Sequence, residues 1–90
     1  MASKKAVIKK ISSRLPEKTN QISELFDQSD FFRFICEDYV ICLQMLERYK
    51  STAQMKKKGY LKEYEILLEE LEKELLARLQ DNEELKLKVD

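Results

Sequence analysis

The sequence predicts an all-α protein: an antiparallel helical hairpin, about 30–56 and 60–81, preceded by one or two short helices. The chain has 90 residues but only one Gly and one Pro, whereas β-sandwiches and barrels need many turn residues. Apolar residues recur in steps of three and four over two long stretches, which is the spacing of amphipathic helices. Hydrophobic residues make up 43% of the chain, enough for a core rather than a disordered tail. We therefore expect a single small helical domain over 1–90.

Residues 1–16 are basic and contain no acidic residue. Val7 or Ile8, Ile11 and Leu15 repeat at helical spacing, so a short amphipathic helix is expected. A targeting segment or a membrane-surface anchor is an alternative for this arm, although targeting peptides favour Arg and Lys predominates here. Pro16 should end this helix and begin a second over 17–27. The second helix carries apolar residues on one face, namely Ile22, Leu25 and Phe26.

Ser29 or Asp30 is the expected N-cap of the 30–56 helix. Its apolar seam keeps heptad-like steps: Phe32, Ile35, Tyr39, Cys42, Leu46, Tyr49 and Ala53. The lysines at 56–58 suit a helix C-terminus, and Gly59 suits the left-handed cap that follows one. The sequence therefore predicts that the helix ends there.

The 60–81 helix has its own seam, formed by Leu61, Tyr64, Leu68, Leu71, Leu75 and Leu79. Asp81–Asn82 is its expected weak point, and 83–90 form a tail that frays or continues the helix. A short connection between two helices makes them antiparallel neighbours. Folding the seams about residue 57 pairs Leu46 with Leu68 and Tyr39 with Leu75, and all such pairs are apolar.

A second apolar stripe runs along the 30–56 helix, about 115° from the seam. We call it the ridge, and its members are Phe34, Ile41 and Met45. The N-terminal segments would cover the ridge in a small bundle, and a second copy would cover it in a dimeric four-helix core. The small size of the chain favours the homodimer, and a different partner protein is the third possibility.

Composition argues against catalysis and against metal or cofactor binding. The chain has no His, which removes the commonest metal ligand and acid–base group. One Gly cannot form a phosphate-binding loop. Cys36 and Cys42 are six residues apart on one helix, too far for a disulfide, and are expected to be buried, reduced thiols. We therefore expect a non-enzyme without cofactors, located in the cytoplasm and lacking a transmembrane segment.

The charges are segmented, although the net charge is zero. Residues 48–62 carry a net charge of +6 between acidic blocks at 21–47 and 63–90. The basic residues at the expected tip are Arg48, Lys50, Lys56, Lys57, Lys58 and Lys62. Interleaved with Tyr49 and Tyr60, they can neutralise phosphates and stack on bases. The leading hypothesis is nonetheless a protein-interaction or structural module acting through apolar helix faces, and a nucleic-acid-contacting accessory protein is the alternative.

Overall fold

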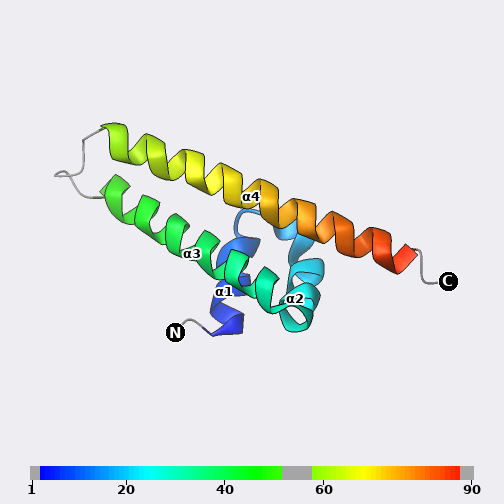
Figure 1. Ribbon diagram of the computed structural model, residues 1–90. Coiled ribbons are helices and arrows are strands. Elements are labelled where there is room, and N and C mark those ends of the chain that lie inside the picture. Colours follow the sequence, from blue (N-terminus) through cyan, green and yellow to red (C-terminus); the bar gives the residue numbers. More distant parts are fainter. Residues whose placement is uncertain (1–2, 52–57, 88–90) are drawn as a thin grey trace.

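The computed structural model describes residues 3–51 and 58–87, and within these ranges every element is helical. Helix α1 spans Lys4–Ser12, a 3₁₀ turn η1 spans Pro16–Lys18, and α2 spans Thr19–Gln28. Helix α3 spans Asp30–Ser51, and α4 spans Lys58–Leu87. The long helices α3 and α4 run antiparallel, while α1 packs against the middle of α3 and α2 against its N-terminal half (Figure 1). The all-α bundle predicted from the sequence is thereby confirmed.

The short N-terminal helices begin where local chemistry places them. The Ser3 hydroxyl accepts a hydrogen bond from the Ala6 amide at 3.2 Å and caps α1. Pro16 occupies the first position of η1, where its fixed φ suits a helix start and its missing N–H removes no helical hydrogen bond. The predicted break at Pro16 is confirmed, although α1 already ends at Ser12.

Helix α3 begins as expected from the sequence. The Ser29 hydroxyl accepts a hydrogen bond from the Phe32 amide at 3.1 Å, which makes Ser29 its N-cap. The described part of the helix runs to Ser51, and the predicted end near 56, with Lys56 and Lys57, lies outside the described residues. Gly59 does not supply a left-handed cap: it lies in the first turn of α4.

Helix α4 continues six residues beyond its predicted end at 81, reaching Leu87. Asp and Asn each cost less than about 1 kcal/mol in a helix interior, and contacts on both sides of them compensate. Leu79 is buried before them, and Lys86 forms an ion pair with Glu24 of α2 after them.

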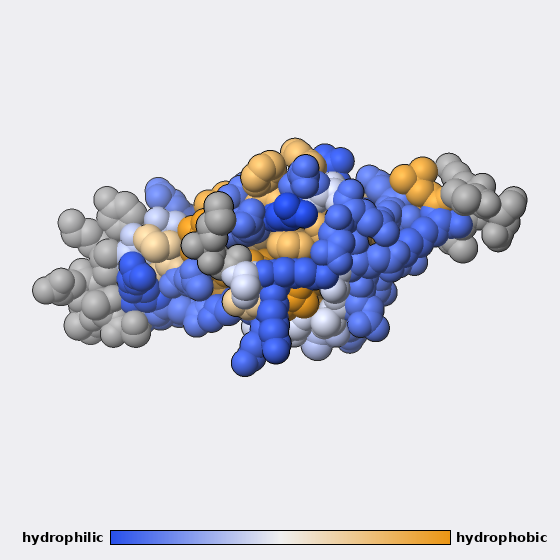
Figure 2. All heavy atoms as spheres, turned by 90° about the horizontal axis from the view of Figure 1, so that it is seen from below, coloured by the Kyte–Doolittle hydropathy of each residue, from blue (hydrophilic) through white to orange (hydrophobic). Residues whose placement is uncertain are grey.

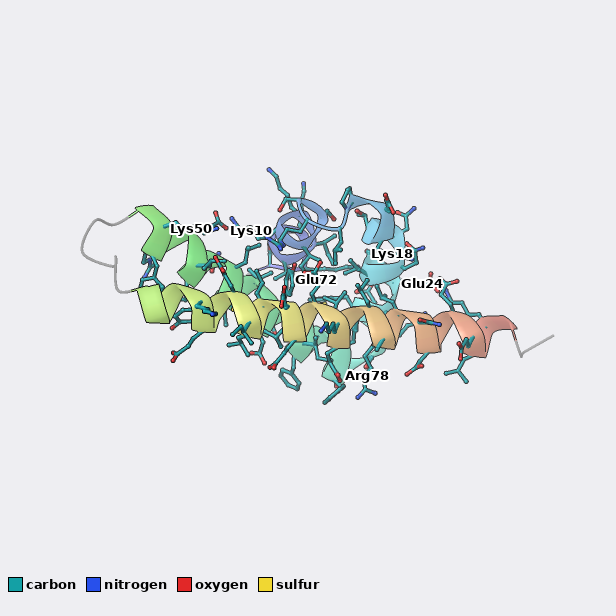
Figure 3. The ribbon with its side chains drawn as sticks, turned by 90° about the horizontal axis from the view of Figure 1, so that it is seen from above. Lys10, Lys18, Glu24, Lys50, Glu72 and Arg78 are labelled. Carbon is teal, nitrogen blue, oxygen red and sulfur yellow. The ribbon has the colours of Figure 1, made fainter. Side chains whose placement is uncertain are left out.

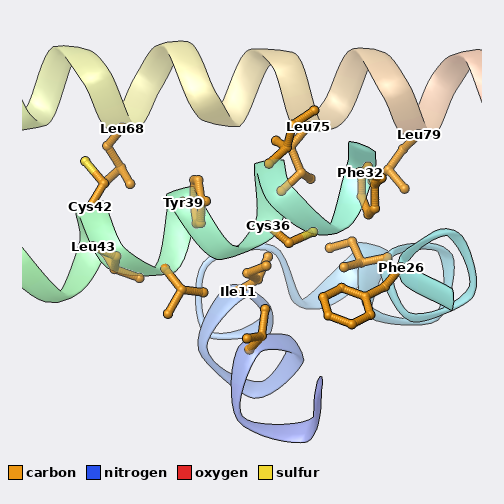
Figure 4. Packing of buried hydrophobic residues seen from close by; sticks show 14 of the residues in the cluster. Ile11, Phe26, Phe32, Cys36, Tyr39, Cys42, Leu43, Leu68, Leu75 and Leu79 are labelled. Carbon is orange, nitrogen blue, oxygen red and sulfur yellow. The ribbon is translucent and has the colours of Figure 1, made fainter. Parts of the chain in front are cut away.

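The core lies where α3 meets its neighbours (Figure 4). Helix α4 packs on one side of α3, and α1 and α2 pack on another. The buried residues include every apolar seam position of α3 from Phe32 to Leu46, together with Val7, Ile11, Ile22, Leu25, Phe26, Leu68, Leu75 and Leu79. The predicted apolar face of the second short helix is thus buried in full.

Two side chains of α3 contact Tyr64 of α4. The Tyr49 and Tyr64 ring centroids are 5.1 Å apart, within one residue of the predicted register. Two turns before Tyr49, the Cys42 thiol donates a hydrogen bond to the carbonyl of the same Tyr64 at 3.4 Å, a contact eight residues away from the predicted register. The individual pairs Leu46–Leu68 and Tyr39–Leu75 remain predictions. None of the described helices is long and apolar enough to cross a membrane.

Candidate interaction surface

Helix α3 is covered on one side and open on the other. Val40 is 4% exposed and contributes, with Ala6 and Lys9 of α1, to the wall of a surface groove. Its neighbour Ile41, about 100° further round the helix, is 58% exposed. The side of α3 that carries Ile41 is therefore not covered by α1, α2 or α4.

The ridge lies on this uncovered side. Phe34 is 63% exposed, and Met45 is half-buried. The N-terminal segments do fold back onto α3, as one predicted arrangement required, but they cover the Cys36–Val40–Leu43 side instead. The ridge is consequently exposed in the single chain.

The structure extends the ridge with two residues that sequence reasoning missed. Phe31 is 54% exposed, and the Arg78 guanidinium of α4 lies 4.7 Å from its ring centroid. Arg78 lies on the side of α4 away from Lys10 and Lys18 (Figure 3). Leu67 precedes Arg78 by eleven residues, slightly more than three full turns, so it shares that edge of α4. Leu67 is also exposed.

We define the open face as the ridge together with Phe31 and Leu67. Phe31 could have been recognised from the sequence, because it precedes Phe34 by three residues and so lies on a neighbouring part of the helix surface. Leu67 gave a weaker signal, because it flanks the apolar seam of the 60–81 helix, in which Leu68, Leu75 and Leu79 are buried. Figure 2 views the molecule from below Figure 1, on the side of α1, and shows hydrophobic side chains among hydrophilic ones over the middle of the molecule.

Both thiols sit in surroundings that suppress their reactivity. Burial, assisted by the negative charge of Glu37, raises the pKa of Cys36 to about 12. Burial also raises the pKa of Cys42. Thiolates are the nucleophilic and metal-binding form of cysteine, so these residues act as small core hydrophobes. Among residues 3–51 and 58–87, no group of three or more Cys, Asp or Glu side chains is arranged to hold a metal ion.

A polar junction beneath the α3–α4 seam was not foreseen. Arg14, just after α1, forms an ion pair with Glu72 of α4 at 3.8 Å. The Tyr39 hydroxyl is buried nearby without a hydrogen-bond partner among the described residues. Burial raises the pKa of Tyr39, Glu72 raises it further, and Arg14 opposes them. This junction ties the N-terminal segment to α4, and its members are too far apart in sequence for a spacing pattern to reveal it.

The predicted basic tip is only partly described. Arg48, Lys50 and Lys62 are exposed at the same end of the α3–α4 pair. Lys58 begins α4, while Lys56 and Lys57 lie outside the described residues. Acidic groups share this end: Glu47 pairs with Lys10 of α1 at 2.6 Å, and Glu63 and Glu65 follow Lys62.

No protein-family model matches the chain, and neither the curated protein sequences nor the solved structures contain a significant match to it.

Proposed function

We propose that this chain is a non-catalytic helical module that binds a protein surface through its open face. The observation that supports the proposal is the exposure of Phe34 and Ile41, each more than half accessible, on a helix whose other sides are packed. Soluble monomers seldom expose a contiguous apolar patch larger than a few hundred Å² unless the patch binds something.

The size of the open face fits this role. A large side chain presents about 200 Å² when fully exposed, so the exposed fractions of Phe31, Phe34, Ile41 and Leu67 leave about 400 Å² of apolar surface. That area lies within the range of about 300–600 Å² found for the largest, often functional, patch on a monomer.

The open face is also held in a fixed shape. Helix α3 is anchored by α4 along its length and by α1 and α2 on another side. The Arg78 guanidinium restrains the Phe31 ring at one end of the face. A preorganised surface loses less conformational entropy on binding than a flexible one, which favours this face over the chain ends as the binding element.

The test places a photo-crosslinking residue at position 41 and, as a matched control, at position 66. Ile66 is an exposed residue of α4 that lies outside the open face. After crosslinking in the native host, mass spectrometry should detect protein adducts of discrete mass from position 41 and none from position 66. We further expect Phe34→Ser/Ile41→Ser to retain wild-type helicity and to compete poorly for those adducts.

Equal adduct patterns at positions 41 and 66 would contradict the proposal. The nucleic-acid alternative makes a different prediction, namely retention on RNA that falls steeply with salt. Lys50→Gln/Lys62→Gln would then weaken retention while the open-face variant leaves it unchanged. That pair of results would replace the proposal with the alternative.

A further inference from the structure

We propose that the occupant of the open face is a second copy of this chain, with α3 packed antiparallel against α3 of the second copy about a two-fold axis at Ile41. This inference rests on the proposed function, because it names the partner for the same face. Three features of α3 support it: the spacing of its exposed residues, the order of its charges, and the exposed apolar area.

The spacing is symmetric about Ile41. Phe34 precedes it by seven residues and Arg48 follows it by seven, so all three lie on nearly one line along the helix. An antiparallel two-fold therefore places Ile41 against its own copy and Phe34 level with Arg48 of the second copy. Within the chain, Arg78 over the Phe31 ring already shows this guanidinium–aromatic contact.

The charges favour the antiparallel alignment. Glu37 and Asp38 lie before the centre of the ridge, residues 39–46 carry no charge, and Glu47 and Arg48 follow. Glu47 already pairs with Lys10 of α1, which leaves Arg48 as the charge on the line of the ridge. The uncharged stretch supplies the middle of the contact, where charged groups are depleted in protein interfaces. An antiparallel two-fold brings Glu37 within one turn of Arg48 of the second copy, whereas a parallel arrangement would align Glu37 and Asp38 with their own copies.

The area matches what a stable dimer needs. A standard interface buries about 800 Å² on each partner, of which about 60% is apolar. The open face already offers about 400 Å² from its four most exposed side chains, and half-buried Met45 adds to it. Docking two copies in this way forms a four-helix core from two α3–α4 pairs.

The experiment uses the full chain with a single added thiol. Ile41→Cys places a cysteine at the proposed two-fold axis. Packed helices have axes about 8–10 Å apart, so Cα atoms that face each other across the axis come within the range of a disulfide. The native thiols do not interfere, because both are buried and the pKa of Cys36 is about 12. Under mild oxidation we expect Ile41→Cys to become a covalent dimer at least tenfold faster than the control Ile66→Cys.

Sedimentation supplies the second measurement. We expect a wild-type dimer at micromolar concentration and a helical monomer for Ile41→Asp, because burying two facing carboxylates is costly. If Ile41→Asp does not fold, Phe34→Ser/Ile41→Ser replaces it and should be monomeric.

Two outcomes would overturn the inference. One is a monomeric wild type together with disulfide formation that is no faster for Ile41→Cys than for Ile66→Cys. The other is a dimer that persists when the ridge is made polar. The photo-crosslinks then separate the two proposals. Adducts from position 41 with a different protein would leave the proposed function standing and refute only the second copy as partner. Absence of any adduct specific to position 41 would refute both.

Discussion

Two sides of α3 carry apolar residues, but one side is buried and the other is exposed. Phe32 is 1% exposed and Phe34 is 63% exposed, although the two phenylalanines are separated by one residue. Phe32 lies on the seam side beside α4, and Phe34 lies where no described element of the chain covers it. An apolar stripe on a helix therefore shows that a surface needs burial but does not show which partner supplies it.

The same contrast appears in how each side is stabilised. The covered side is enclosed by α1, α2 and α4 and forms one continuous core. The open side is bordered by charged groups, among them Arg78, which is itself half exposed. We therefore expect substitutions on the covered side to change folding stability, and substitutions on the open side to change association.

The largest expected effect comes from the two phenylalanines. Phe32→Ala should lower the free energy of unfolding by about 3–5 kcal/mol, because it leaves a cavity in a packed site. Phe34→Ala should change it by less than about 0.5 kcal/mol at the lowest protein concentration that gives a signal. Urea denaturation followed by circular dichroism measures both. Equal losses would show that both sides of α3 are packed within one chain.

A smaller loss is expected where α1 covers α3. Ile11 is fully buried, so Ile11→Ala should cost about 2–4 kcal/mol and speed amide hydrogen exchange in α1. Ile66→Ala is the matched control on an exposed surface and should change stability by less than about 0.5 kcal/mol. Wild-type stability for Ile11→Ala would mean that α1 does not cover this side in solution.

Tyr39→Phe should stabilise the protein by about 1 kcal/mol, because it removes a buried hydroxyl that lacks a hydrogen-bond partner. It should also alter the alkaline limb of the stability curve. The folded-state pKa of Tyr39 is raised above 10.0, so the unfolded chain releases that proton first and wild-type stability falls as pH rises past 10.0. Thermal melts of both proteins from neutral to alkaline pH test this, and the difference should grow with pH. A less stable variant would reveal a partner for the hydroxyl.

The smallest expected effect is at the C-terminal end of α4. In the wild type, the ion pair with Lys86 lowers the pKa of the Glu24 carboxyl. Lys86→Ala removes this pair. Exposed pairs contribute little to stability and are screened by salt, so the small loss should vanish at high ionic strength. Chemical denaturation at two salt concentrations measures it. A large, salt-independent loss would mean that this contact is needed for α4 to extend past Asp81.

The sequence by itself determined the helical class, the break at Pro16, an N-cap at Ser29 or Asp30 and the apolar faces that needed burial. These features follow from local propensity, capping chemistry and periodicity, all of which act over a few residues. The ridge could be identified in the same way, because Phe34, Ile41 and Met45 lie too far round the helix to share the seam.

Only the tertiary structure decided which surface each apolar face meets. It placed α1 and α2 against the Val40 side of α3, left Ile41 exposed, and joined Phe31 to the edge of α4 through Arg78. It also carried α4 through Asp81 and placed Gly59 inside a helix. The physical reason is that the packing of each face and the ends of the helices depend on contacts between residues far apart in the chain. The combined energy of these contacts exceeds the fractions of a kcal/mol by which local sequence favours one helix end over another.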